Sequence, residues 1–119
     1  MTTMNNMFRS AVLFNQPLSI TWDTSKVINM AGMFYAAKSF NQKLSRFNVA
    51  KVTTMRLMFY QAYEFDQDLN LWNVSNVVDM HNTFAIAVKF DQDLSRWDVS
   101  KVTTFEGMFR KATKFNSGT

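Results

Sequence analysis

The feature that most constrains this chain is a repeat with a step of 25 residues. Large aromatic residues return at that step in three separate registers. These registers are Trp22, Phe47, Trp72 and Trp97; Phe34, Phe59, Phe84 and Phe109; and Phe40, Phe65, Phe90 and Phe115. A fixed period of this length is typical of a solenoid, in which every copy is one supersecondary unit stacked on the next. The repeat therefore predicts a stack of similar coils.

One part of each copy has the apolar spacing of a short helix. In residues 55–62 the apolar side chains stand at i, i+3, i+4 and i+7, which places them on one helical face, and residues 30–37 and 105–112 repeat the pattern. A residue with a short side-chain oxygen precedes each copy of this pattern. These residues are Asn29, Thr54, Asp79 and Thr104. Such an oxygen can accept a hydrogen bond from the free amides of a first helical turn, so we expect a short helix in every copy.

The other part of the copy has the alternation of a short strand. Leu44, Phe47 and Val49 are large or β-branched residues with the spacing of a half-buried strand, and a turn-like Phe-(Asn/Asp)-Gln-x-Leu segment joins helix to strand. The predicted fold is an α/β solenoid of the leucine-rich-repeat type. It is a right-handed stack of strand-turn-helix coils, with a parallel sheet on one side and short helices on the other.

The repeat also predicts the domain organisation. We expect one repeat domain over residues 1–119, made of a partial copy 1–21, full copies 22–46, 47–71 and 72–96, and a partial copy 97–119. Soluble solenoids need polar capping units, and neither end of this chain has one. Either the chain is a segment of a longer array, or its ends meet other chains.

Composition narrows the classes of function. The chain has no cysteine, so it has no disulfide frame and no thiolate metal site. Its net charge of +4 comes from mixed charges, and its aromatic residues occupy core registers, which does not favour a nucleic-acid groove. The longest apolar run, residues 84–88, is too short to enter a bilayer. We find no nucleophile–base pair, phosphate loop or metal cluster, so we expect neither an enzyme nor a cofactor.

A longer motif supports a resemblance to a known family. The copies follow Phe-(Asn/Asp)-Gln-Asp-Leu-Ser-x-Trp-Asp-Val-Ser-x-Val-Thr-x-Met-x-x-Met-Phe, which resembles the 25-residue BspA-like repeat class of surface proteins over essentially the whole chain. The resemblance implies a leucine-rich-repeat-like fold and a cell-surface or secreted setting, with adhesion or matrix roles for some members and no catalytic residues. A targeting segment would then lie outside this chain. The sequence departs from the motif at Thr24, Phe47, Ala50 and Thr83.

The expected partner site is the concave face of the solenoid. On a horseshoe, the residues that alternate with buried strand positions line that face, which is the usual recognition surface of repeat proteins. These residues are Asp23, Ser25, Arg46, Asn48, Leu71, Asn73, Ser75, Arg96, Asp98 and Ser100.

Two further motifs have a simpler explanation beside the functional one. The carboxylates of Asp66, Asp68, Asp91 and Asp93 would lie close together on adjacent coils and suit Ca²⁺, but the EF-hand pattern fails, and short polar side chains at turns usually satisfy nearby amides. We therefore expect no metal site. Asn73-Val74-Ser75 matches the glycan acceptor pattern, although the repeat itself generates it.

Two functions remain open at this point. The first is an extracellular or cell-surface module for adhesion or recognition, which binds protein or glycan through the concave face. The second is a structural array that stacks end to end into fibres or a surface layer, because uncapped ends with open strand edges invite pairing. Self-association through the ends is expected in the second case.

Overall fold

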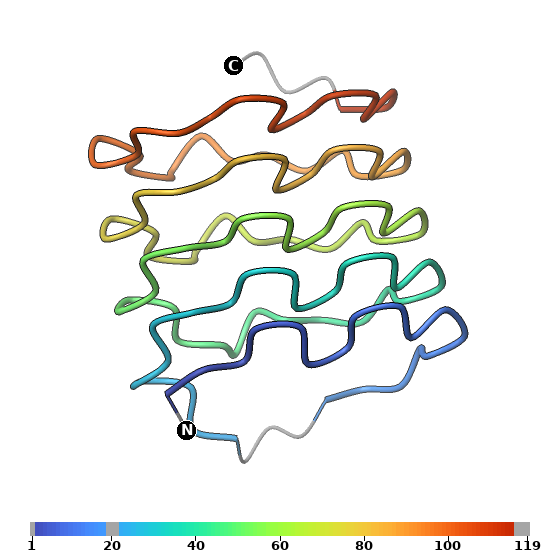
Figure 1. Cartoon of the computed structure of the whole chain (residues 1–119), viewed down its shortest axis with the longest axis horizontal. Coiled ribbons are helices and arrows are strands. Elements are labelled where there is room, and N and C mark those ends of the chain that lie inside the picture. Colours follow the sequence, from blue (N-terminus) through green and yellow to red (C-terminus); the bar gives the residue numbers. More distant parts are fainter. Residues whose placement is uncertain (1, 19–21, 116–119) are drawn as a thin grey trace.

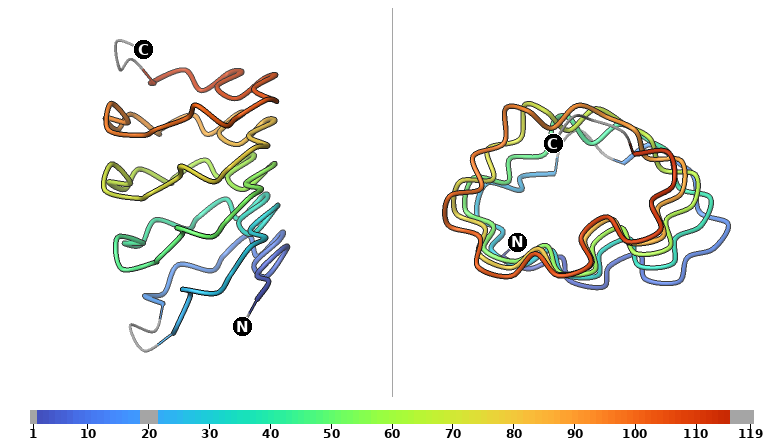
Figure 2. Two further views of the ribbon diagram at one scale, coloured as in Figure 1. Left: turned by 90° about the vertical axis from the view of Figure 1, so that its left-hand side faces the viewer. Right: turned by 90° about the horizontal axis from the view of Figure 1, so that it is seen from above.

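The chain winds into a stack of coils, and one 25-residue repeat forms one coil (Figure 1). The computed structural model describes residues 2–18 and 22–115. Seen along the stack, successive coils follow nearly the same closed, elongated path, and in the perpendicular view they lie one above another (Figure 2). Five equivalent residues, one from each coil, form a column of isolated parallel bridges. They are Thr3, Asn29, Thr54, Asp79 and Thr104.

Residues 2–18 and 22–115 contain no helix, so the helices expected from the sequence are wrong. In their place each coil has a row of consecutive turns, which we call the turn row (residues 4–11, 30–37, 55–62, 80–87 and 105–112). In the second coil the amide of Met33 donates to the carbonyl oxygen of Met30 at 3.3 Å, and that of Ala37 donates to Phe34 at 3.0 Å. Both bonds span three residues, as in a β-turn, instead of the four of an α-helix.

The remaining amides of the turn row bind the next coil. In the second coil, Met30, Gly32, Phe34 and Ala36 donate to Thr54, Arg56, Met58 and Tyr60 at 2.7–3.1 Å. A helix would use these amides within its own turn, so these bonds between coils exclude it. Gly32 and Ala36 also have φ of 64° and 55°, a left-handed conformation that a right-handed helix cannot contain.

The helix-like spacing of apolar residues is explained by the turns. Residues at the two corners of each turn point into the stack, and the two central residues point outward. Met30 and Met33 are the corners of one turn, Phe34 and Ala37 are the corners of the next, and all four are fully buried. The corners of two consecutive four-residue turns stand at i, i+3, i+4 and i+7, the same spacing as one helical face.

The strands and the parallel sheet were also predicted wrongly. Residues 44–52 form two turns, closed by bonds from Phe47 to Leu44 and from Val52 to Val49, both of 3.0 Å. The isolated bridges lie on the other part of the coil, just before the turn row. Since the described residues form neither helices nor extended strands, the fold is not an α/β solenoid of the leucine-rich-repeat type.

The core between the walls of the stack is built from phenylalanine columns. Phe34, Phe59 and Phe84 lie one above another with ring centroids 5.3–5.6 Å apart and nearly parallel planes. A second column runs through Phe40 and Phe65, and each of its rings stacks at 4.3 Å on the first-column ring of its own coil. Aromatic rings therefore contact each other both within and between coils, which couples every coil to its neighbours.

Candidate recognition edge

Most of the predicted partner-binding residues lie on one side of the stack. The loops around residues 50, 75 and 100 project at the left of Figure 1, away from the phenylalanine columns. We call residues 22–25, 45–50, 70–75 and 95–100 the recognition edge. The strand face that these residues were expected to line does not form, because the edge consists of turns.

The polar side chains at the tips of this edge shape their own loops. Asp98 Oδ1 accepts hydrogen bonds from the Ser100 amide at 3.0 Å and from the Ser100 hydroxyl group, and the pKa of Asp98 is lowered by the hydroxyl first and the amide second. The pKa of Asp23 is lowered by the same two bonds from Ser25. The carboxylate oxygens therefore hold the turn conformation.

Asparagine takes the same role in the two middle coils. Asn48 Oδ1 accepts the amide of Ala50 at 3.0 Å, and Asn73 Oδ1 accepts the amide and the hydroxyl group of Ser75 at 3.0 and 2.6 Å. Asn73 is exposed. Its assignment as a glycan acceptor remains a prediction.

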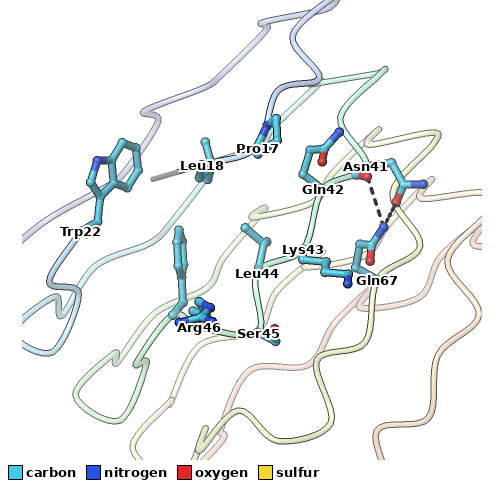
Figure 3. Close-up of a pocket in the computed structure, with 11 residues that line it drawn as sticks. Pro17, Leu18, Trp22, Asn41, Gln42, Lys43, Leu44, Ser45, Arg46 and Gln67 are labelled. Carbon is cyan, nitrogen blue, oxygen red and sulfur yellow. Dashed lines mark hydrogen bonds between the residues drawn. The ribbon is translucent and has the colours of Figure 1, made fainter. Parts of the chain in front are cut away.

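A cleft opens on the edge between the first two coils. It has a volume of about 400 Å³ and lies between Trp22 on one side and the chain from Asn41 to Phe47 on the other (Figure 3). The Trp22 and Phe47 rings are 6.5 Å apart and tilted by 32°. Two cations, Lys43 and Arg46, line the cleft, and both are exposed. No carboxylate is among its described lining residues, so the cleft offers aromatic surface together with positive charge.

A shallower groove continues the edge between the fourth and fifth coils. Four predicted partner-binding residues line it: Leu71, Asn73, Arg96 and Asp98. Its volume is about 280 Å³, and Leu71 is 76% exposed. The Arg96 amide donates to Asn70 Oδ1 at 3.0 Å, which fixes the spacing of the two coils at this point. The structure thus brings these four side chains together at a groove between coils.

The tryptophans of the edge differ in their bonding. Trp72 Nε1 donates to the Leu44 carbonyl oxygen at 3.0 Å, and Trp97 Nε1 donates to Leu69 at 2.8 Å. These bonds tie each indole to the preceding coil. Trp22 makes no such bond among the described residues, and its ring lines the cleft. Sequence reasoning missed Trp22 and Lys43 because the aromatic register was assigned to the core. The signal available was the first step, 26 residues from Phe8 to Phe34.

Next to the cleft, conserved-looking amides of the repeat are used structurally. Gln67 Nε2 donates to both oxygens of Asn41, at 2.9 and 3.2 Å, and the Asp66 amide donates to Asn41 Oδ1 at 2.9 Å (Figure 3). Gln42 binds Asn15 in the same way. These bonds join one coil to the next.

The four aspartates considered for Ca²⁺ lie at turns. Asp66 Oδ1 accepts the Asp91 amide at 3.0 Å and the Gln92 side-chain amide at 2.9 Å. Asp68 accepts the amide of Asn70, and Asp93 accepts that of Ser95, which lowers the pKa of Asp93. Within residues 2–18 and 22–115 no group of three or more histidine, cysteine or acidic side chains gathers to hold a metal ion.

The described part of the chain contains no helix of the length and apolarity that a membrane span needs.

Comparison with known proteins gives one match. The model of a family described as a Mycoplasma protein of unknown function, DUF285, matches residues 1–87 and 52–119, so its two matches together extend over the whole chain. No curated protein and no solved structure matches the chain.

Proposed function

The chain belongs to the family described as a Mycoplasma protein of unknown function, DUF285, and from that starting point we propose that it is a non-enzymatic recognition module at the cell surface or outside the cell. It binds protein or glycan through the recognition edge. The extracellular setting is drawn from the resemblance of its repeat to the BspA-like class. The observation that carries the proposal is the cleft of Trp22, Lys43, Arg46 and Phe47.

The chemistry of this cleft favours an acidic ligand. Lys43 and Arg46 supply positive charge, and arginine binds carboxylate, sulfate and phosphate groups with two parallel hydrogen bonds. Trp22 and Phe47 supply flat apolar surface, and both tryptophan and arginine are common among the residues that dominate binding energy. An acidic glycan, or an acidic segment of a surface protein, matches this combination.

The shallower groove extends the same surface. Arg96 and the exposed Leu71 lie about one coil apart in sequence, so a long ligand that contacts the cleft can continue along the edge. Successive repeats would then supply similar contacts at regular intervals, which is how repeat proteins bind extended partners.

The test is binding to immobilised acidic and neutral glycans and to acidic peptides. We expect the chain to bind acidic probes, and we expect Trp22→Ala and Arg46→Ala each to weaken binding about tenfold or more, as for central interface residues. Arg110→Ala is the matched control, because it removes the same side chain from the turn row and should leave binding unchanged. Retention of full affinity by both edge variants, or no binding to any acidic probe, would contradict the proposal.

The structural array is the second candidate. The observation in its favour is the pair of exposed end faces of the stack, whose donors and acceptors are described below.

A further inference from the structure

The fifth coil presents a row of backbone donors that no described residue accepts. In every earlier coil, four alternate amides of the turn row donate to the following coil. In the fifth coil the equivalent amides belong to Phe105, Gly107, Phe109 and Lys111, and none of them donates to a carbonyl oxygen within residues 2–18 and 22–115. Because an amide buried without a partner is costly, this face can be covered only by groups that accept these bonds, or by water.

The first coil presents the matching row of acceptors. In every later coil, four carbonyl oxygens accept the bonds from the preceding coil. The equivalent oxygens in the first coil belong to Thr3, Asn5, Met7 and Arg9, and none of them accepts a bond from the described residues. The two end faces of one molecule therefore carry complementary rows with the same four-bond spacing.

Apolar surface accompanies the donor row. A groove of about 660 Å³ lies on the fifth coil, lined by core-register side chains that include Trp97, Val99, Phe105 and Phe109. Phe105 is 45% exposed, whereas Met30, Met55 and Met80, which occupy its position in the inner coils, are fully buried. On the opposite face Met7 is 41% exposed, whereas its equivalent Met33 is fully buried. Both end faces therefore expose apolar positions that the inner coils bury.

We propose that the groove on the fifth coil receives the first coil of a second copy of this chain. In this head-to-tail junction the four amides donate to the four carbonyl oxygens of the partner copy, and Phe8 of the partner continues the column above Phe109. The occupant is a second copy because the acceptor spacing, the chain direction and the aromatic register of the first coil are those of the coil that the groove lacks. This inference does not depend on ligand binding at the recognition edge.

The polarity of the rows sets the symmetry of the junction. Two donor rows cannot bond each other, and neither can two acceptor rows, so the contact is heterologous and leaves one end open after each addition. The register also places Arg9 of one copy beside Arg110 of the other in the column that holds Tyr35 and Tyr60 in the inner coils. These like charges oppose the junction, and their effect is screened by salt.

The experiment is sedimentation of the purified chain over a range of concentrations, with one variant blocked at each end. We expect the wild-type chain to form dimers and longer species as the concentration rises. Phe105→Lys puts a charge into the groove, and Met7→Lys puts one on the opposite face, so each variant alone should stay monomeric. An equimolar mixture should form a dimer and nothing longer, because each variant keeps one functional end.

Charge reversal tests the same register in the opposite direction. Arg110→Glu should strengthen association, since it pairs with Arg9 of the next copy, and added salt should then weaken the association instead of strengthening it. Lys51→Glu, an equal charge change on an exposed inner loop, should leave association as in the wild type. A wild-type chain that remains monomeric at every concentration would overturn the proposal. So would blocked variants that still associate singly, or that fail to pair when mixed while their circular dichroism matches the wild type.

Discussion

Phe84 lies over Phe109 with ring centroids 5.6 Å apart and planes only 3° from parallel. Phe84 is fully buried because it has a ring on each side, Phe59 at 5.3 Å being the other, whereas Phe109 is only partly buried. Two phenylalanines with identical places in the repeat thus differ in burial because one belongs to an inner coil and the other to the last described coil. Stability in this fold depends on position along the stack as well as on residue type.

Removal of an inner ring should therefore cost more than removal of an outer one. Phe59→Ala leaves a cavity between two stacked rings, and we expect it to lower the free energy of unfolding by about 3–5 kcal/mol. Phe109→Ala, the matched variant at the end of the column, should cost clearly less. Urea denaturation measures both. Equal losses for the two variants would contradict the coupling between coils inferred from the ring columns.

Relief of a strained backbone position should stabilise the chain. Ile86 has φ of 59°, a conformation in which a β-branched side chain is crowded, so Ile86→Gly should raise the free energy of unfolding by up to about 1 kcal/mol. The exposed Ile28 has no positive φ, and Ile28→Gly should destabilise by a similar amount. Thermal melting of the pair gives the comparison, and a loss of stability in both would show that Ile86 is unstrained.

The buried hydroxyl group of Thr83 should contribute to stability. Thr83 is fully buried and its Oγ1 donates to the Met55 carbonyl oxygen at 3.1 Å, so Thr83→Val should cost about 1 kcal/mol. Thr103 is exposed and donates to Val78 at 3.3 Å, and Thr103→Val should have a much smaller effect. Chemical denaturation separates the two outcomes. If Thr83→Val is neutral, the hydroxyl group serves only to fill space at a position that holds Met33 and Met58 in other coils.

Acid should weaken the loops of the recognition edge. The pKa values of Asp23 and Asp98 are lowered from 3.8 by bonds from Ser25 and Ser100, so the folded chain favours the ionised carboxylates. Their contribution is present above pH 3.8 and is lost as the pH falls through the lowered pKa values. The double variant Asp23→Asn and Asp98→Asn should therefore lose less thermal stability on acidification than the wild type. Asn48 and Asn73 show that an amide oxygen can hold the same turn. Superimposable melting curves against pH would rule this contribution out.

The repeat and the buried residues could be predicted from the sequence, but the local structure could not. Leu57 and Gln61 illustrate the reason, because both adopt a positive φ although neither is glycine. Of the ten described residues with positive φ, only Gly32 and Gly107 are glycines, so the usual turn signal is missing from most coils. The left-handed positions are stabilised by bonds from neighbouring coils, which a pattern within one repeat does not reveal.

The residues of the edge could be predicted more easily than its grooves. Asp98 and Asn73 were recognised because they alternate with buried residues, and they lie at exposed loop tips. The cleft between Trp22 and Arg46 was missed because it depends on how far the first two coils separate. That separation is a property of two coils together, and it leaves no mark on either repeat alone.

The bonds of the turn row all point the same way, from the amides of one coil toward the carbonyl oxygens of the next. The stack is consequently a vector, with positive partial charge at one face and negative partial charge at the other. Any filament grown from it inherits this arrow, and its two tips would elongate at different rates however long it became.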